Sequence, residues 1–80
     1  MKVRLFKAEF CLACKEALKR LKELQSKYNF DLEIYEFTEN RELFKELGIK
    51  FVPLILIDSK PISLKDLETL LEHKRLSGEL

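Results

Sequence analysis

Apolar and polar residues alternate at the start of the chain, and the apolar spacing then becomes helical. Residues 2–6 alternate before ending in Phe6, which predicts a strand with at least one buried face. From Cys14 to Tyr28 apolar residues recur every three or four positions, with Lys and Glu between them. Asn29 is a suitable end for this segment. The pattern predicts a strand followed by an amphipathic helix.

The middle of the chain repeats this order in a shorter form. Residues 32–37 form a second apolar strand that is interleaved with Glu33 and Glu36. A short helix over residues 43–47 follows. We expect Thr38 to cap the start of this helix, and Gly48 to end it, because glycine adopts the left-handed conformation just past a helix most easily.

The last third contains the most apolar segment. Residues 54–57 are all aliphatic, which is typical of a strand covered on both faces, so we expect this strand inside the sheet. Residues 61–62 begin with a proline and can form only a very short edge strand. Ser63, with Asp66 three positions later, predicts the cap of a final amphipathic helix. We expect the tail from Ser77 to fray.

Together these segments give the order β-α-β-α-β-β-α in one domain over residues 1–80, without a linker or a repeat. This order fits an α/β fold with a single sheet and helices on its faces. With 46% hydrophobic and 36% charged residues, the chain is too apolar for disorder and has no apolar run long enough to span a bilayer. We expect a folded protein without a membrane partner.

The formal net charge is +1, and basic residues are spread along the chain, which gives no support for nucleic-acid binding. Residues 1–10 contain four charged side chains and no continuous apolar stretch of the kind found in secretory signals. We therefore expect a cytoplasmic protein in a reducing compartment.

The chain has two cysteines, Cys11 and Cys14, placed where the first strand meets the first helix. Thiols at this spacing can close on each other within one helical turn, and the helix N-terminus favours the thiolate of the first. In a reducing compartment such a pair is more often catalytic, redox-sensing or metal-binding than structural. A structural pair and half of a metal site remain open at this point. His73 is the only other soft ligand, so a four-ligand site would need a second subunit.

Two motifs and the order of the elements resemble the thioredoxin superfamily in its glutaredoxin-sized form. The motifs are Leu5-Phe6 ahead of Cys11-Leu12-Ala13-Cys14, and Gly48-Ile49-Lys50-Phe51-Val52-Pro53. The likeness is greatest to the small glutaredoxin-like thioredoxins of archaea and some bacteria. It implies a minimal thioredoxin fold, with a four-stranded mixed sheet flanked by three helices. It also implies a cis peptide before Pro53, with Pro53 facing Cys11.

In the mechanism that this resemblance implies, Cys11 attacks a substrate disulfide as a thiolate and Cys14 resolves the mixed disulfide. We expect a lowered pKa for Cys11. The N–H groups of the first helical turn, Lys15 and Lys7 would favour this, whereas Glu9 would oppose it. We expect Cys14 to be unreactive and partly buried.

The resemblance also indicates where a substrate would lie. A residue before a cis proline leaves its backbone N–H and C=O unpaired, so Val52 is expected to pair with an extended polypeptide. Phe10, Leu12, Phe51 and Pro53 are expected to form an apolar rim around it. Such a rim favours polypeptide disulfides over charged small molecules.

Two segments of this chain differ from the corresponding segments of thioredoxins and glutaredoxins, and these differences bear on its redox potential and its partners. Leu12-Ala13 stands where thioredoxins carry Gly-Pro and glutaredoxins often Pro-Tyr, so the resemblance does not set the redox potential. Pro61-Ile62-Ser63 replaces the Gly-Gly at which glutaredoxins dock glutathione's carboxylate, which argues against a dedicated glutathione site.

The chain is thus expected to be a monomeric thiol-disulfide oxidoreductase without a cofactor. Its partners would be protein disulfides and an upstream donor, either a thioredoxin reductase-like flavoprotein or glutathione. The alternative is a metal-binding or redox-sensing module of the same fold, using the same cysteine pair without fast turnover.

Overall fold

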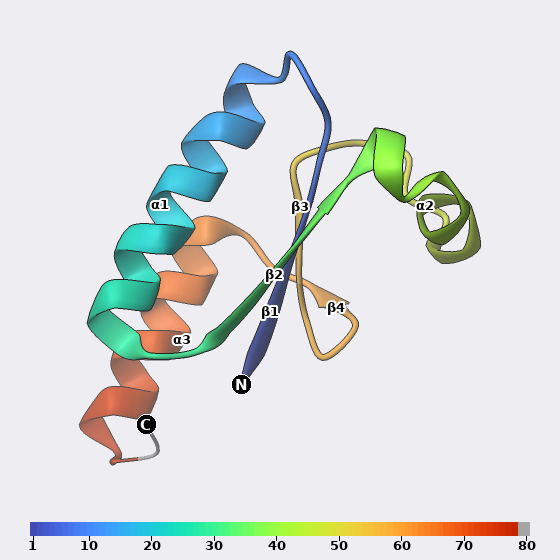
Figure 1. Ribbon diagram of the computed structural model, residues 1–80. Coiled ribbons are helices and arrows are strands. Elements are labelled where there is room, and N and C mark those ends of the chain that lie inside the picture. Colours follow the sequence, from blue (N-terminus) through green and yellow to red (C-terminus); the bar gives the residue numbers. More distant parts are fainter. Residues whose placement is uncertain (79–80) are drawn as a thin grey trace.

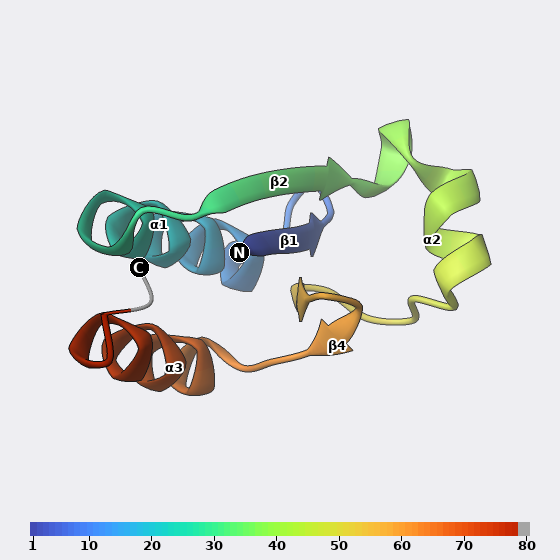
Figure 2. The same ribbon diagram turned by 90° about the horizontal axis from the view of Figure 1, so that it is seen from below.

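Two helices cover one face of a four-stranded sheet and a third helix lies against the other face in the computed structural model, which describes residues 1–78 (Figures 1 and 2). The tail that we expected to fray continues into residues 79–80, which lie outside the described residues. The order of the elements confirms the predicted β-α-β-α-β-β-α pattern. The elements are β1 (Lys2–Lys7), α1 (Leu12–Tyr28), β2 (Asp31–Glu36), the 3₁₀ turn η1 (Phe37–Glu39), α2 (Arg41–Leu47), β3 (Leu54–Ile57), β4 (Lys60–Pro61) and α3 (Leu64–Leu76).

The sheet is mixed, with the strand order β2-β1-β3-β4. Strands β1 and β2 are parallel and joined by α1, whereas β3 runs antiparallel to β1 and β4 antiparallel to β3. The aliphatic strand β3 is therefore an inner strand, as predicted, and the short strand β4 lies at the edge. Figure 2 shows α1 and α3 on one side of this sheet and α2 on the other.

Alternation along β1 divides the core between the two faces of the sheet. Val3 and Leu5 are fully buried under α1 and α3, whereas Phe6 is fully buried on the α2 side. There Phe6 stacks on Tyr35 with ring centroids 5.1 Å apart and meets Phe44 edge-on at 5.4 Å. These aromatic contacts attach the short helix α2 to the sheet.

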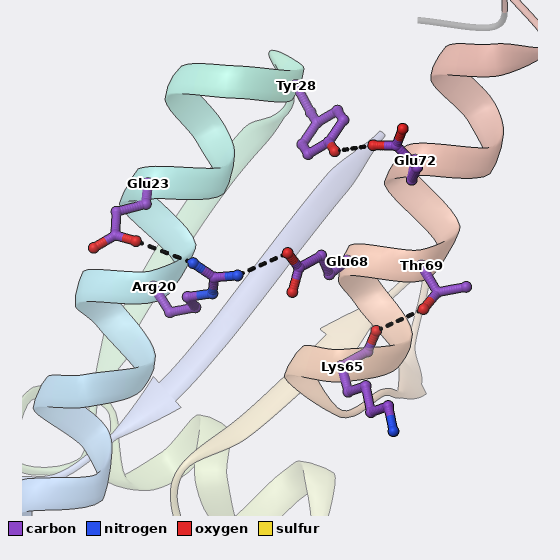
Figure 3. A network of polar contacts seen from close by, with 7 residues as sticks. All are labelled: Arg20, Glu23, Tyr28, Lys65, Glu68, Thr69 and Glu72. Atoms are coloured by element: carbon purple, nitrogen blue, oxygen red, sulfur yellow. Dashed lines mark hydrogen bonds and ion pairs between the residues drawn. The ribbon is translucent and has the colours of Figure 1, made fainter.

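Polar contacts also join α1 to α3 along their exposed seam (Figure 3). Arg20 of α1 donates to Glu68 of α3 at 2.7 Å and to Glu23 of its own helix at 3.2 Å. At the last residue of α1, the Tyr28 hydroxyl donates to the Glu72 carboxylate. Exposed ion pairs stabilise weakly, so burial of the apolar stripe fixes α1 in place and these bonds set its alignment with α3.

Several predicted helix ends are confirmed by the backbone. Asn29 and Gly48 adopt left-handed φ values of 50° and 67° just past α1 and α2. The Ser63 hydroxyl accepts the Asp66 backbone N–H at 3.1 Å, which caps α3. Within residues 1–78, no helix combines the length and the apolarity needed to cross a bilayer.

The prediction that Thr38 caps α2 is wrong, and so is the placement of Phe37 in the second strand. Strand β2 ends at Glu36, and Asn40 occupies the N-cap position of α2. The Thr38 hydroxyl instead donates to the Glu36 carboxylate, and the Asn40 amide donates to the Glu36 carbonyl at 2.9 Å. These local bonds turn the chain one residue early. Phe37 then packs edge-on against Phe44 at 5.3 Å.

Candidate redox site

The loop between β1 and α1 carries Phe10 in an uncommon backbone conformation. The chain turns after Lys7 at the end of the molecule where α1 begins, far from the N-terminus (Figure 1). Phe10 has φ 57°, in the left-handed region that bulky L-residues rarely adopt. Its ring is 99% exposed, so no burial compensates for this conformation. The turn therefore holds an aromatic ring in solvent directly before the first cysteine.

Cys11 is the N-cap residue of α1. Its backbone is extended, and its Sγ accepts the Cys14 backbone N–H at 3.1 Å. The Cys11 carbonyl accepts the first intrahelical bond, from Lys15, at 3.1 Å. The first turn of α1 contains no acidic residue. The positive end of the helix dipole is thus directed at the Cys11 sulfur without a carboxylate in that turn to oppose it.

The two cysteine sulfurs form a disulfide, and the Cα atoms of Cys11 and Cys14 lie 5.1 Å apart. This separation is within the usual range for disulfides. Cys14 is fully buried, which goes beyond the partial burial that we expected, whereas Cys11 is partly exposed. The site therefore presents one sulfur to the outside and keeps the other inside the fold.

Lys7, at the end of β1, faces an acidic partner. It is paired in register with Glu36 at the end of β2. The Thr38 hydroxyl, then backbone N–H groups and the Lys7 charge, hold the pKa of Glu36 below its ordinary value. One carboxylate oxygen of Glu36 is buried and has no hydrogen-bond partner among residues 1–78. Glu36 therefore offsets part of the Lys7 charge, and support from Lys7 for a Cys11 thiolate stays a prediction.

The loop between α2 and β3 contains the second motif. The Val52–Pro53 peptide bond is cis, which confirms the conformation that the resemblance implied. Within the described chain, neither backbone group of Val52 has a hydrogen bond in a turn, loop or cap. The neighbouring Phe51 side chain is 69% exposed. This loop thus offers free main-chain groups beside an exposed aromatic ring.

Phe51 is a wall of several cavities, and two of them also include Val52 or Pro53 of this loop. We name the first, of about 160 Å³, the α2-side cavity; Ala8, Phe37, Lys50, Phe51 and Val52 are among its lining residues. We name the second, of about 420 Å³, the α3-side cavity; Ala17, Phe51, Pro53, Ser63 and Asp66 are among its lining residues. The α2-side cavity includes Ala8, which precedes the cysteine pair, and the α3-side cavity includes Ala17 of α1, which follows it; neither cysteine is a lining residue.

The predicted site residues are thus only partly brought together. Phe51, Val52 and Pro53 line the cavities, whereas Phe10 and Leu12 (79% exposed) line neither of them. A continuous rim formed by all of them stays a prediction.

Sequence reasoning missed two charged residues at these cavities, Lys50 and Asp66. Lys50 stands inside the second motif, next to Phe51, which was the available signal. Asp66 was recognised only as part of a helix cap.

Among residues 1–78, no three His, Cys, Asp or Glu side chains lie close enough together to hold a metal ion. A metal at the cysteine pair would therefore need ligands from outside the described residues.

A four-stranded mixed sheet, a Cys-x-x-Cys disulfide at the start of α1 and a cis proline before β3 define a protein of the thioredoxin fold class. A family model described as a thioredoxin domain matches residues 1–64. The chain therefore belongs to the thioredoxin domain family. No curated protein sequence matches it significantly.

Solved structures agree on the fold. Thioredoxin 1 from the thermophilic eubacterium Thermosipho africanus TCF52B is similar with a TM-score of 0.71 and 22% identity, over 94% of this chain and 99% of that one. A structure described as a malarial protein is similar with a TM-score of 0.66 and 22% identity, over 90% of this chain and 93% of that one. At this level of identity the likeness is one of fold.

Proposed function

We propose that this protein is a thiol-disulfide oxidoreductase that reduces disulfides of proteins, with Cys11 as the nucleophile and Cys14 as the resolving thiol. The observation that carries the proposal is the asymmetry of the pair: Cys11 is partly exposed at the N-cap of α1, and Cys14 is fully buried one turn later. An exposed helix N-terminus favours an anion by about 0.3–1 kcal/mol, so it favours the Cys11 thiolate.

The cycle begins with the reduced pair. The Cys11 thiolate attacks one sulfur of a substrate disulfide, forms a mixed disulfide and releases the other substrate sulfur as a thiolate. Cys14, deprotonated, then attacks the Cys11 sulfur, which closes the Cys11–Cys14 disulfide and releases the second substrate thiolate. Two electrons pass from the dithiol to the substrate, and the two thiol protons pass through solvent to the released thiolates.

Closure of the internal disulfide is fast because both sulfurs lie within one helical turn. The Cα separation of 5.1 Å between Cys11 and Cys14 allows the bond without a backbone rearrangement. The free main-chain groups of Val52 would pair with an extended substrate strand beside the cysteines. Phe51, exposed in the same loop, would add apolar contact, and so would Phe10 and Leu12 on the cysteine loop.

The reduced pair is regenerated by an external two-electron donor, either a thioredoxin reductase-like flavoprotein or glutathione. A reducing compartment such as the cytoplasm suits a cycle whose resting form is the dithiol. One chain is sufficient for the chemistry, since both cysteines come from α1 and its cap.

The test is reduction of a protein disulfide by the purified chain, with dithiothreitol as donor. Wild type is expected to accelerate the reaction, and Cys11→Ser to abolish the acceleration. Cys14→Ser is expected to retain attack but to accumulate mixed disulfides, measured by mass spectrometry. A redox titration should give one two-electron couple between roughly −200 and −280 mV.

The same measurements decide against the proposal if the two variants exchange behaviours or if no reversible couple is found. Stoichiometric metal in freshly isolated protein, together with the absence of a reversible Cys11–Cys14 disulfide, would support the metal-binding alternative. A reversible couple without turnover of protein disulfides would support the redox-sensing alternative.

A further inference from the structure

The two cavities beside the cis proline lie on opposite faces of the sheet. The α2-side cavity is bordered by Phe37 and Phe44, from the region of α2, and the α3-side cavity by Ala17 and Ser63, from α1 and the start of α3. Figure 2 shows these helices on the two sides of the sheet. Phe51, which lines both cavities, stands between them.

The cavities also follow one another along the chain. Residues 49–52 line the α2-side cavity, and residues 53–55 line the α3-side cavity. An extended polypeptide rises about 3.3 Å per residue, so a strand paired along this loop passes from one cavity to the other within a few residues. Side chains before and after its cysteine then face different cavities.

These cavities carry opposite charges. Within the described chain, Lys50 is the one charged residue that lines the α2-side cavity, and Asp66 is the one that lines the α3-side cavity. Neither side chain forms an ion pair with another of residues 1–78. The Arg41 guanidinium lies 5.6 Å from the centre of the Phe37 ring, which adds positive charge near the α2-side cavity.

The start of α3 also borders the α3-side cavity, and a helix N-terminus by itself attracts anions. Its dipole is equivalent to about half a positive charge, whereas the Asp66 carboxylate carries a full negative one. The Ser63 hydroxyl already accepts the Asp66 N–H. The mouth of the α3-side cavity is therefore negative and repels a carboxylate.

We infer that this pair of cavities selects polypeptide disulfides by charge. An acidic side chain of the substrate lies beside Lys50 and a basic one beside Asp66, on the two sides of the substrate cysteine that is attacked. The inference rests on the proposed function and specifies its substrate class. An apolar surface around Phe51 supplies contact, and the two unpaired charges fix the direction in which the substrate lies.

The experiment uses three peptides that differ in charge alone. Each contains one cysteine joined through a disulfide to the same chromogenic thiol. One peptide has glutamates before the cysteine and lysines after it, the second has the reverse order, and the third has glutamines on both sides. Fully reduced wild-type protein is mixed with each at low ionic strength, and the second-order rate constant is measured from release of the chromogenic thiol.

One charged peptide is expected to react roughly two- to fivefold faster than its reverse, with the neutral peptide between them. The double variant Lys50→Glu/Asp66→Lys is expected to invert this order. Lys50→Gln/Asp66→Asn is expected to abolish it. Lys22→Glu, a charge reversal at an exposed position on α1 that lines neither cavity, is expected to leave the order unchanged. Thermal unfolding of each variant confirms that it is folded.

Equal rates for the three peptides, or an order that survives the double charge reversal, would overturn the inference and leave the proposed function intact. Failure of reduced wild type to react with any peptide, with no Cys11–Cys14 disulfide formed, would overturn both. The two failures are distinguished by the oxidation state of the cysteine pair after the reaction.

Discussion

Replacement of Phe10 by glycine is expected to stabilise the protein and to slow its reaction with polypeptide disulfides. Phe10 has φ 57°, and a residue with a Cβ in this region costs about 1–2 kcal/mol. Glycine removes this cost but gains freedom in the unfolded chain, which offsets about 0.5–1 kcal/mol. The ring is 99% exposed, so its removal sacrifices almost no burial. The net gain in unfolding free energy is therefore about 0.5–1 kcal/mol.

Thermal unfolding of the oxidised protein measures the first part of this prediction. For a domain of this size, the expected gain raises Tm by roughly 2–8 °C. Phe10→Ala is the matched control, because it removes the ring but retains the Cβ, and it should leave Tm close to that of wild type. The second part is measured as the rate of peptide disulfide reduction. Both variants lose the exposed ring, and a loss of about 1 kcal/mol of contact would slow each about fivefold.

Phe10→Gly and Phe10→Ala together test both the backbone strain at Phe10 and the role of its ring in recognition. If Phe10→Gly is no more stable than Phe10→Ala, the left-handed backbone is not a source of strain and the stability argument is refuted. If both react with peptides as fast as wild type, the Phe10 ring takes no part in recognition. The two conclusions are independent, since stability is measured without substrate.

Three further predictions concern positions away from the cysteines. Gly48→Ala meets no atom within 4 Å but places a Cβ at φ +67°, so urea denaturation should show a loss of about 1 kcal/mol with the redox rate unchanged. The Tyr35 hydroxyl, followed by Lys2 and Arg4, holds the pKa of Glu33 below its ordinary value of 4.5, so this carboxylate stabilises the fold at neutral pH and less as the pH falls through the lowered pKa. Tyr35→Phe should therefore lower the urea midpoint at pH 7, and the difference from wild type should shrink in acid; a pH-independent difference would contradict this. Arg20→Gln should lower the midpoint slightly at low salt and less at high salt, because its ion pairs are exposed; equal effects at both salt concentrations would show that another interaction is lost.

Features that depend on neighbouring residues could be predicted from the sequence. The helix ends at Asn29, Gly48 and Ser63 are set by residues within one turn, and the strand alternation of β1 depends on its own side chains. The cysteine pair could be predicted for the same reason, since both thiols belong to the cap and first turn of α1.

Features that depend on competition between local bonds or on distant segments could not be predicted. Thr38 is a suitable cap by residue type, but its hydroxyl binds Glu36, and no pattern indicates which bond forms. Likewise, Ala8 and Phe51 line one cavity only because the fold joins segments about forty residues apart. The positions of Lys50 and Asp66 at these cavities likewise depend on the tertiary fold and not on their sequence neighbours.

Cys11 is the N-cap residue of α1, and in the proposed function its sulfur is also the atom at which electrons enter or leave. Its sulfur accepts the Cys14 N–H, so a change in sulfur charge alters how firmly the first turn is held. Folding and reduction thus form a thermodynamic cycle. In this cycle, the difference in unfolding free energy between the oxidised and reduced protein equals the difference between the folded and unfolded chain in the free energy of forming the disulfide. A substitution that loosens the start of α1 more in one redox form than in the other changes both differences by the same amount. Unfolding curves of the two redox forms can therefore measure the potential of this cysteine pair relative to that of the same pair in the unfolded chain.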